Sequence, residues 1–282
     1  MKDRAKKISK IVFKVLLYFV AGLALLFLGV FIAMRLHLTN VKGSVDSASQ
    51  YFNDTQDKGA REKEAEQIAT PWVTSAEWQT VSAGFEKDKS EILQASSVSG
   101  VPPRLILSVI VPEQFRFFTS NREAFKKFFQ PLQVLGNYTQ FSYGIAGIKT
   151  DTAMTVENNL KDPASPYYLG SADEHLLDFT TNDPDTERMN RLTDSHNHYY
   201  SYLYTALLLK EEMTQWQNAG FPINNRPEIL ATLFNIGFYR SIPNATPQTG
   251  GATITLNGED YTFGSLAFSF YYSNELTQDF PN

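Results

Sequence analysis

The feature that most constrains this chain is an apolar run of 20 residues at positions 15–34, which contains no charged residue and no proline. At about 1.5 Å rise per residue, a helix of this length spans about 30 Å, the thickness of the hydrocarbon core of a bilayer. The run is longer than the apolar region of a signal peptide, about 7–15 residues, and no small-x-small cleavage site follows it. We therefore predict an uncleaved transmembrane anchor at 15–34, with a cleaved signal sequence as the alternative.

Charge is distributed unevenly along the 282 residues. Residues 1–14 carry six basic side chains and one acidic side chain, whereas the whole chain has a formal charge of −5, so the remainder carries about −10. The positive-inside rule then places residues 1–14 in the cytoplasm and the rest in the periplasm or outside, which predicts a single-pass protein of the cytoplasmic membrane. The acidic body argues against a nucleic-acid partner. Because the chain has no cysteine, disulfide scaffolds, thiolate metal sites and cysteine nucleophiles are excluded.

The exported part divides into a polar stretch and a globular domain. Residues 35–73 are polar, charged and poor in large apolar groups, which predicts a stalk or a solvated linker. Residues 74–282 are predicted to form one mainly helical domain with a small β-hairpin at Asn257-Gly258, the two-residue turn favoured between antiparallel strands. Helices are predicted at 75–100, from Pro102 and Pro103 onward, and at 122–130, 152–160, 187–217, 227–237 and 264–276.

Glu113 is the main candidate for chemistry. It lies at the end of an apolar helix face with Ile106, Val109 and Ile110, where a carboxylate is expected to be partly desolvated. Desolvation disfavours the charged form and produces a carboxylic acid that can donate a proton near neutral pH. The alternative is a helix-end glutamate that turns to solvent or pairs with Arg104 or Arg116.

Three sequence blocks around Glu113 resemble soluble lytic transglycosylases and goose-type lysozymes. The block SGVPPRLILSVIVPEQF resembles the helix of that family that ends in the catalytic glutamate. The block YGIAGIKTDTA resembles the family's G-L-M-Q-I-x-P-x-T-A stretch, and ILATLFNIGF resembles its A-Y-N-x-G motif, with Asn235 and Gly237 on the matched positions. The blocks come in the family's order over about residues 90–275. The resemblance implies a lysozyme-like fold of the transglycosylase (SLT) type.

The blocks also depart from the family pattern. Gln114 stands where serine is usual, and Gly147 stands where the motif has a glutamine expected to contact sugar. Pro112 lacks an N–H and predicts that the helix kinks or ends just before Glu113. These departures bear on activity more than on the fold.

The resemblance implies cleavage of the MurNAc–GlcNAc β-1,4 bond of peptidoglycan glycan strands by a single glutamate, Glu113. It also implies sugar contacts from Gly144, Ile148 and Asn235 on the matched positions and from Tyr143 next to them. Tyr271 is a further candidate, because the Tyr- and Phe-rich helix near the C-terminus occupies the place of the family's last aromatic segment. A two-carboxylate hydrolase would need a second acid. Asp151 is the one candidate, with a helix N-cap as its alternative role. Core packing is the alternative for Tyr143 and Tyr271, and a turn or helix end is the alternative for Asn235.

Other sequence patterns give weaker evidence for a function. Asp194, His196 and His198 form a D-x-H-x-H string, but alternate positions on a helix do not share a face, so we expect no metal and no cofactor. Two functions from different classes follow from the sequence. One is a membrane-anchored transglycosylase-like muramidase. The other is a non-catalytic lysozyme-like module that binds peptidoglycan or serves as a structural part of an envelope complex, with protein partners there.

Overall fold

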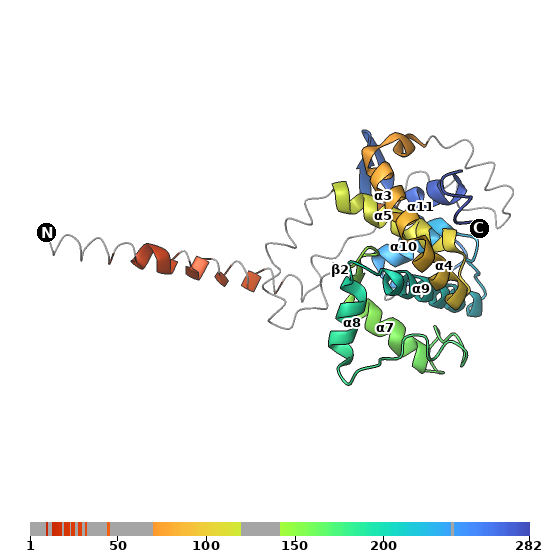
Figure 1. Cartoon of the computed structure of the whole chain (residues 1–282), viewed down its shortest axis with the longest axis horizontal. Helices are drawn as coiled ribbons and strands as arrows, with labels where there is room; N and C mark the ends of the chain where they lie inside the picture. Colours follow the sequence, from red (N-terminus) through yellow and green to blue (C-terminus); the bar gives the residue numbers. More distant parts are fainter. Residues whose placement is uncertain are drawn as a thin grey trace.

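The chain folds into a mainly helical body, so the predicted mainly-α class is confirmed. The computed structural model describes residues 70–119, 142–237 and 240–282, together with scattered positions among the first 45 residues. Its helices are the 3₁₀ helix η2 (Pro71–Thr74) and the α-helices α3 (Ala76–Lys87), α4 (Lys89–Ser99), α5 (Pro103–Thr119), α7 (Thr150–Lys161), α8 (Pro184–Thr193), α9 (Tyr199–Asn218), α10 (Pro227–Ile236) and α11 (Phe263–Tyr272) (Figure 1). Its strands are β1 (Ser44–Val45), β2 (Ser142–Tyr143), β3 (Ile148–Lys149), β4 (Gly250–Gly251), β5 (Thr253–Leu256) and β6 (Glu259–Thr262).

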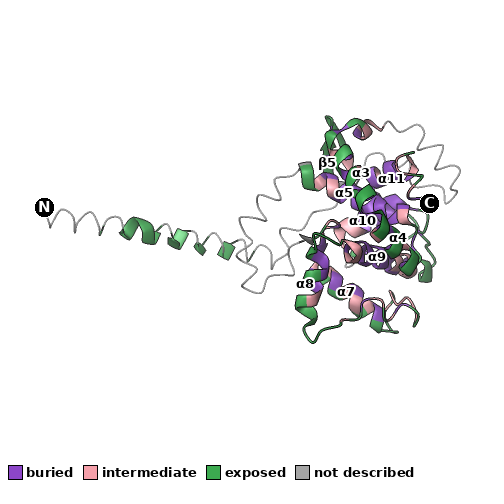
Figure 2. Cartoon of the chain, in the orientation of Figure 1, coloured by how far each residue is buried: buried purple, intermediate pink, exposed green. Residues whose placement is uncertain are grey.

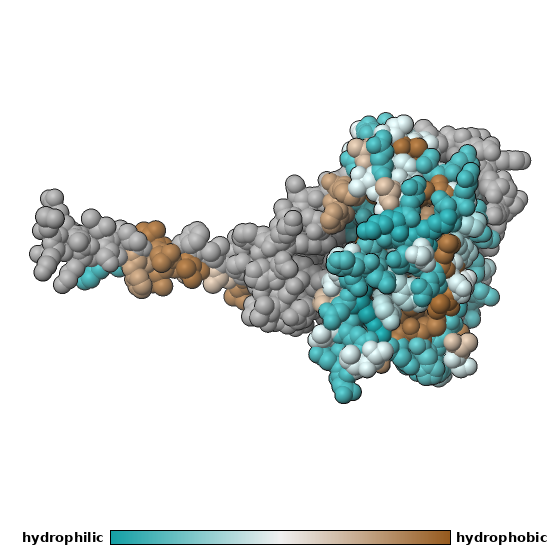
Figure 3. Space-filling model, viewed as in Figure 1, coloured by the Kyte–Doolittle hydropathy of each residue, from teal (hydrophilic) through white to brown (hydrophobic). Residues whose placement is uncertain are grey.

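The apolar run at residues 15–34 lies largely outside the described residues. The positions that are described there are helical, and their large apolar side chains are exposed, from 47% at Ile32 to 72% at Tyr18 (Figure 3). Among the described residues, no helix has the length and apolar character needed to cross a bilayer. The helix predicted at 122–130 and most of the stretch at 35–73 also lie outside them.

Most helix boundaries follow from local capping. The Ser75 side chain accepts a hydrogen bond from the N–H of Trp78 at 3.0 Å, and this N-cap starts α3 as predicted. Gly100 adopts a left-handed conformation, φ +75°, and ends α4. Pro103 opens α5 and Pro227 opens α10, where the missing N–H costs nothing. One difference is a break at Asp88 that divides the predicted helix at 75–100 into α3 and α4.

The single long helix predicted at 187–217 is wrong, because the structure has two helices there. α8 ends at Thr193 and α9 begins at Tyr199. Between them, the Asp194 carboxylate accepts the N–H groups of His196 and Asn197 at 2.8 and 3.2 Å. Such local side-chain bonds compete with helical hydrogen bonds and favour a turn.

The core lies where α5, α9, α10 and α11 meet. Every residue of α9 from Ser201 to Leu209 is buried, so this helix is enclosed on all sides (Figure 2). α4 packs along α9, and α11 packs against both α5 and α10. A cluster of aromatic rings joins the start of the body to α11: Trp72 lies 5.0 Å from Trp78, and its indole N–H donates to Ser269 at 2.8 Å. Since Trp72 is fully buried, the folded body includes residues before position 74.

A buried arginine fixes α5 against α11. Arg104, at the start of α5, is fully buried, and its guanidinium donates to the carbonyl oxygens of Phe270, Tyr271, Ser273 and Glu275 at 2.6–2.8 Å. These oxygens include the unsatisfied C-terminal carbonyls of α11, which a cation stabilises. Burial lowers the pKa of Arg104 to about 10. Because the end of α11 meets the start of α5, the two helices run antiparallel.

The sheets are small antiparallel pairs. β5 and β6 pair in the predicted hairpin, with Asn257 and Gly258 at φ +51° and +84° in its turn. A second hairpin, β2 with β3, was not predicted; it pairs Tyr143 with Ile148 across the turn at 144–147. β1 pairs with β4, which ties residues 44–45 to the body.

Candidate functional site

The predicted acid, Glu113, lies in the last two turns of α5. The expectation that the helix ends at Pro112 is wrong, since α5 continues through this proline to Thr119. The residues before it are fully buried, and Glu113 itself is 8% exposed. α5 therefore delivers a carboxylate from the apolar core to a nearly enclosed position, as the sequence predicted.

The turn of the β2–β3 hairpin covers the Glu113 carboxylate. Gly147 has φ +62°, and a Cβ atom at this position would lie 2.6 Å from Cδ of Glu113 and closer still to Oε1. No other residue could bring its backbone so near without displacing the carboxylate. Next to Glu113, the Gln114 side-chain amide donates to the carbonyl of Ile145 in the same turn. The glycine that departs from the family pattern is thus the residue on which the carboxylate rests.

Arg116 supplies the positive charge at the site. Its Nη2 atom lies 2.8 Å from Oε1 and 2.6 Å from Oε2 of Glu113, and both side chains are nearly buried, at 12% and 11% exposed. A charge-assisted pair of this kind is stronger than a neutral hydrogen bond. The alternative partner considered from the sequence, Arg104, is committed to the end of α11 instead.

The third sequence block reaches the site through Phe263. The guanidinium carbon of Arg116 lies 5.8 Å from the centre of the Phe263 ring, and Phe234 stacks on the same ring at 6.3 Å. A Cβ at Gly251 would be 2.8 Å from Cβ of Phe263 and 3.0 Å from Oδ1 of Asn235. α5, the hairpin turn, the end of α10 and the start of α11 therefore form one continuous set of contacts.

The side-chain amide of Asn235 accepts one hydrogen bond through its oxygen, and its nitrogen has no hydrogen-bond partner among the described residues. Its Oδ1 accepts the N–H of Ala252 at 3.0 Å, which fixes the end of α10 to the strand region β4–β5. Its amide nitrogen has no hydrogen-bond partner within residues 70–119, 142–237 and 240–282. The residue is half-buried, so this nitrogen is available as a donor.

Three other residues predicted to contact sugar lie in the β2–β3 hairpin and its turn. A Cβ at Gly144, φ +66°, would lie 2.6 Å from Oγ of Ser201 and closer to the carbonyl of Leu192, so this glycine allows the hairpin to pack on α8 and α9. Ile148 is 3% exposed and belongs to the core. The backbone of Tyr143 pairs in the hairpin, whereas its side chain lies outside the described part of the chain. Ile148 is therefore a core residue, whereas Gly144 is exposed beside its contacts with α8 and α9, and its sugar contact stays a prediction.

Tyr271 is also placed away from Glu113. Its carbonyl binds Arg104, which precedes Glu113 by nine residues, or about 13 Å along the helix axis. Its side chain is 9% exposed and packs edge-on against Tyr272 at 5.1 Å. The antiparallel course of α11 takes it to the far end of α5, so core packing describes this residue and the predicted sugar contact is not supported.

The remaining candidates serve local structure. Asp151 lies exposed in the first turn of α7, where a carboxylate complements the helix dipole; the N-cap itself is Lys149. His198 binds Asp88 through Nδ1 at 2.5 Å, and Tyr202 donates to the same carboxylate at 3.0 Å. Within the described ranges, no group of three or more acidic or histidine side chains is arranged to hold a metal ion.

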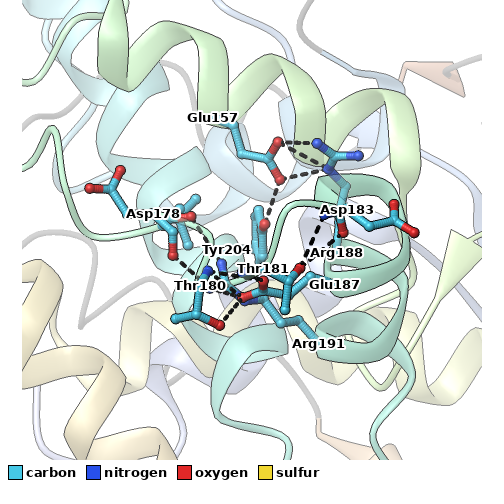
Figure 4. Close-up of polar contacts among 10 residues, drawn as sticks. Glu157, Asp178, Thr180, Thr181, Asp183, Glu187, Arg188, Arg191 and Tyr204 are labelled. Atoms are coloured by element: carbon cyan, nitrogen blue, oxygen red, sulfur yellow. Dashed lines mark hydrogen bonds and ion pairs between the residues drawn. The ribbon is translucent and has the colours of Figure 1, made fainter.

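A second cluster of arginines and carboxylates joins α7, α8 and α9 (Figure 4). Arg188 uses all three of its nitrogens: Nε and Nη2 bind Glu157 at 2.6–3.0 Å, and Nη1 binds Asp185 at 2.6 Å. Tyr204 donates to Glu157 at 2.5 Å. Burial alone would lower the pKa of Arg188, but its bonds to Glu157 and Asp185 raise it. A cavity of about 240 Å³ borders this cluster, and its cations, Arg188 and Lys161, are both paired.

Glu187 in the same cluster is held as an anion. Burial alone would raise its pKa, but hydrogen bonds from the N–H groups of Thr180 and Thr181 and the charge of Arg191 lower it to about 2. These bonds tie the loop before α8 to the helix. The cluster therefore stabilises this part of the fold and leaves few groups for a ligand.

Two further buried carboxylates were missed from the sequence. Glu211 and Glu212 on α9 are fully buried; Asn159 donates to Glu211 at 2.8 Å, and neither oxygen of Glu212 has a hydrogen-bond partner among the residues described. Burial raises the pKa of both groups well above the ordinary value. Two acids inside an apolar helix could have signalled burial. The pair of Glu113 with Arg116 is one of the alternatives stated from the sequence, and the structure has it.

Comparison with known proteins gives no relative for this chain: no family model, no curated protein and no solved structure matches it.

Proposed function

We propose that this protein is a membrane-anchored, lytic-transglycosylase-like muramidase with a lysozyme-like helical domain. Glu113 is its single acid and base, and its substrate is the glycan strand of peptidoglycan. One observation carries the proposal. The three sequence blocks that resemble the transglycosylase family come together in space, with the Glu113 carboxylate seated on Gly147 and linked through Arg116 and Phe263 to Asn235.

The proposed reaction needs one carboxyl group. Glu113 in its acid form protonates the glycosidic oxygen as the bond to C1 of MurNAc breaks, and the carboxylate then accepts the proton of the C6 hydroxyl of the same sugar. The C6 oxygen bonds to C1 and closes a 1,6-anhydro ring, so no water is consumed and the acid is regenerated. A nearly buried carboxyl group suits this role, because proton transfer is favoured where water is excluded. The open amide nitrogen of Asn235 is a candidate donor to the sugar.

The segment at 15–34 would hold the domain at the outer face of the cytoplasmic membrane. Its described side chains are apolar and exposed, which is costly in water and favourable in a bilayer. The basic residues 1–14 would remain inside, where anionic lipids attract them.

One observation favours the second function, a non-catalytic module that binds peptidoglycan within an envelope complex. Nη2 of Arg116 contacts both oxygens of Glu113, so a side chain of the same helix engages the carboxyl group that the reaction would need. In a non-catalytic module, the same pair would simply hold α5 together at its end.

Products from peptidoglycan sacculi decide between these functions. Full-length protein in detergent micelles is compared with Glu113→Gln and with Glu86→Gln, an exposed glutamate on α3 that serves as the matched control. We expect 1,6-anhydro-muropeptides, detected by mass spectrometry, from the wild type and the control, and a loss of at least about 100-fold in Glu113→Gln. Reducing-end products would indicate a hydrolase with a second acid. Binding to sacculi without products, in folded protein, would favour the non-catalytic module.

A further inference from the structure

Two phenylalanine side chains are exposed at the end of α5, one turn beyond the candidate acid. Phe117 and Phe118 are 46% and 45% exposed, whereas Phe115 on the same helix is fully buried. Their rings lie 5.5 Å apart in the edge-to-face geometry that aromatic pairs favour. Apolar groups gathered at one place on a surface mark a site of interaction, whereas single exposed ones need no explanation.

The two rings border the turn of the β2–β3 hairpin. The Glu113 carboxylate rests on this turn, and the Gln114 amide donates to it. Phe117 follows Glu113 by four residues, and Phe118 stands in the same relation to Gln114, so each ring shares a helix face with a side chain that touches the turn. Because helical side chains lean toward the N-terminal end of their helix, both rings are directed back toward the hairpin.

The hairpin turn presents a low surface beside the rings. Gly144 and Gly147 have no side chain, and Ala146 is fully buried. Ile145, the remaining residue of the turn, is half-buried and packs against the core. The turn therefore adds little bulk next to the two phenylalanines, and a flat ligand can lie across it.

A pyranose ring is the kind of ligand that fits this surface. The faces of a β-1,4-linked sugar ring carry C–H groups, which pack on an aromatic ring, while the hydroxyl and acetamido groups around the rim stay hydrated. The position of the rings favours a glycan strand as the occupant. An acid that protonates a glycosidic oxygen needs a sugar held beside it, and Phe117 is exposed on the helix face of Glu113 one turn away.

We propose that Phe117, supported edge-on by Phe118, is a stacking platform for one N-acetylhexosamine ring of the glycan strand, beside the bond that Glu113 acts on. This inference rests on the proposed function and adds a substrate contact beyond the residues on the matched positions. The platform binds the ring that all β-1,4-linked N-acetylhexosamines share. It therefore contributes to affinity for the strand and holds the strand across the hairpin turn.

Binding of a strand that resists cleavage tests the platform. The probe is a tetrasaccharide that alternates GlcNAc and MurNAc and carries sulfur in its β-1,4 linkages. Calorimetry is done on full-length protein in nanodiscs of phosphatidylethanolamine and phosphatidylglycerol. We expect Phe117→Ala to raise Kd at least about fivefold, and Phe117→Leu, which keeps apolar bulk without a flat face, at least about threefold. Phe117→Trp keeps a flat ring and should bind the probe at least as tightly as the wild type.

Phe221→Ala is the matched control. This phenylalanine is 37% exposed and follows the end of α9, about 26 Å along the helix axis from Ser201, which lies against Gly144 of the hairpin turn. Its loss should change Kd less than about twofold. Wild-type affinity in Phe117→Ala or Phe117→Leu overturns the proposal. A wild type that does not bind the probe, or an equal loss in Phe221→Ala, overturns it as well.

Fluorescence shows what covers the platform. The three tryptophans of the chain, Trp72, Trp78 and Trp216, are all buried, so Phe117→Trp adds the one exposed indole. In the free protein this indole should emit as a hydrated group that iodide quenches, and the probe should shift its emission to shorter wavelength and protect it from iodide. Emission already shifted without the probe, or quenched by lipids with brominated chains, would mean that the chain itself or the bilayer covers this position and would overturn the proposal. If Phe117→Ala does not fold, this variant carries the same test.

These results are separable from the outcome with sacculi. An affinity that depends on Phe117, in a protein that releases no anhydro-muropeptides, would retain the platform and reject the catalysis. Anhydro-muropeptides released equally by the wild type and Phe117→Leu, with equal affinities for the probe, would retain the catalysis and reject the platform.

Discussion

Two pairs of arginine and glutamate in this molecule use the same groups in opposite ways. Arg188 binds Glu157 through Nε and Nη2 and Asp185 through Nη1, and Tyr204 donates to Glu157, so the pair has little capacity left for a ligand. Arg116 and Glu113 meet through one nitrogen, Nη2, and the other two nitrogens of Arg116 have no hydrogen-bond partner among the described residues. The difference teaches that burial of an ion pair does not by itself mark a functional site. The bonds left unmade are the better guide.

The two pairs also differ in what they connect. The first joins α7 to α8, and Glu187 and Arg191 extend it to the loop before α8. It therefore holds together segments distant in sequence. The second lies within one turn of α5, where the helix already fixes the positions of both residues, so the fold depends on it less. The Arg116–Glu113 pair differs from the Arg188–Glu157 pair because it lies against the β2–β3 hairpin turn, not because it is stronger.

The largest expected effect on the free energy of unfolding comes from removing the Arg188–Glu157 pair. Arg188→Met keeps the length of the side chain and leaves Glu157 buried without its cation, which should lower the free energy of unfolding by about 3 kcal/mol. The matched change Arg116→Met should cost no more than about 1 kcal/mol, because the pair lies within one turn of α5, whose backbone already fixes both residues. Urea denaturation of both variants measures the difference. Equal losses would show that the second pair is structural as well, and would remove the contrast between the two.

Gly147→Ala should have the next largest effect and should lower the free energy of unfolding by about 2 kcal/mol. Its methyl group would meet the Glu113 carboxylate, and its φ of +62° is strained for any residue with a Cβ. Gly100→Ala is the control, since Gly100 has φ +75° with nothing within 4 Å of the added atom and carries the strain alone. In a Glu113→Ala background the Gly147→Ala loss should fall to that of Gly100→Ala. A loss that does not change in this background would mean that Glu113 does not rest on Gly147.

Glu212 extends the comparison to a buried carboxylate with no hydrogen-bond partner among the described groups. Because burial raises its pKa in the folded state, the neutral form is the stable one; its contribution is complete below the ordinary value near 4.5 and is lost as pH rises toward the raised value. Glu211 shifts in the same direction. Wild-type stability should therefore fall as the pH rises above about 4.5, by up to about 1.4 kcal/mol per pH unit for each of the two groups. Glu212→Gln should flatten this decline, as measured by urea unfolding at each pH. A decline of equal slope in this variant would assign the effect to other groups.

The smallest expected effect belongs to Asp151, the second acid considered from the sequence. Asp151→Asn removes a charge from the first turn of α7 and should cost about 0.5 kcal/mol, measured by thermal unfolding. Products from sacculi should be unchanged, since the residue is exposed and serves the helix. A loss of cleavage in this variant would instead give Asp151 a catalytic part and favour hydrolysis.

The sequence predicted the helices well where a cap or a proline defines their ends. Ser75, Gly100, Pro103 and Pro227 each act on the backbone within one turn, so local rules suffice for them. Local rules failed between α8 and α9, where the bonds of Asp194 with the following backbone favour a turn that separates the two helices. They also missed the β2–β3 hairpin, whose strands have only two residues each.

The candidate site was predictable in part. Glu113 could be found because an acid at the end of an apolar helix face is unusual in any fold. Tyr271 and Ile148 could not be placed, because which face of a helix or strand meets the site depends on the packing of distant elements. The antiparallel course of α11, fixed by Arg104, takes Tyr271 to the other end of α5. Only the folded chain decides that.

By itself, the sequence determined the helical class, most helix ends and the β5–β6 hairpin, since each follows from interactions between residues close along the chain. The tertiary structure alone decided that Gly147 seats the Glu113 carboxylate and that Arg104 binds the end of α11, which leaves Arg116 to pair with Glu113. Gly147 and Glu113 are 34 positions apart and lie on separate elements. Their free energy comes from close packing and from charges out of water, and both depend on distances that exist only after the chain has folded.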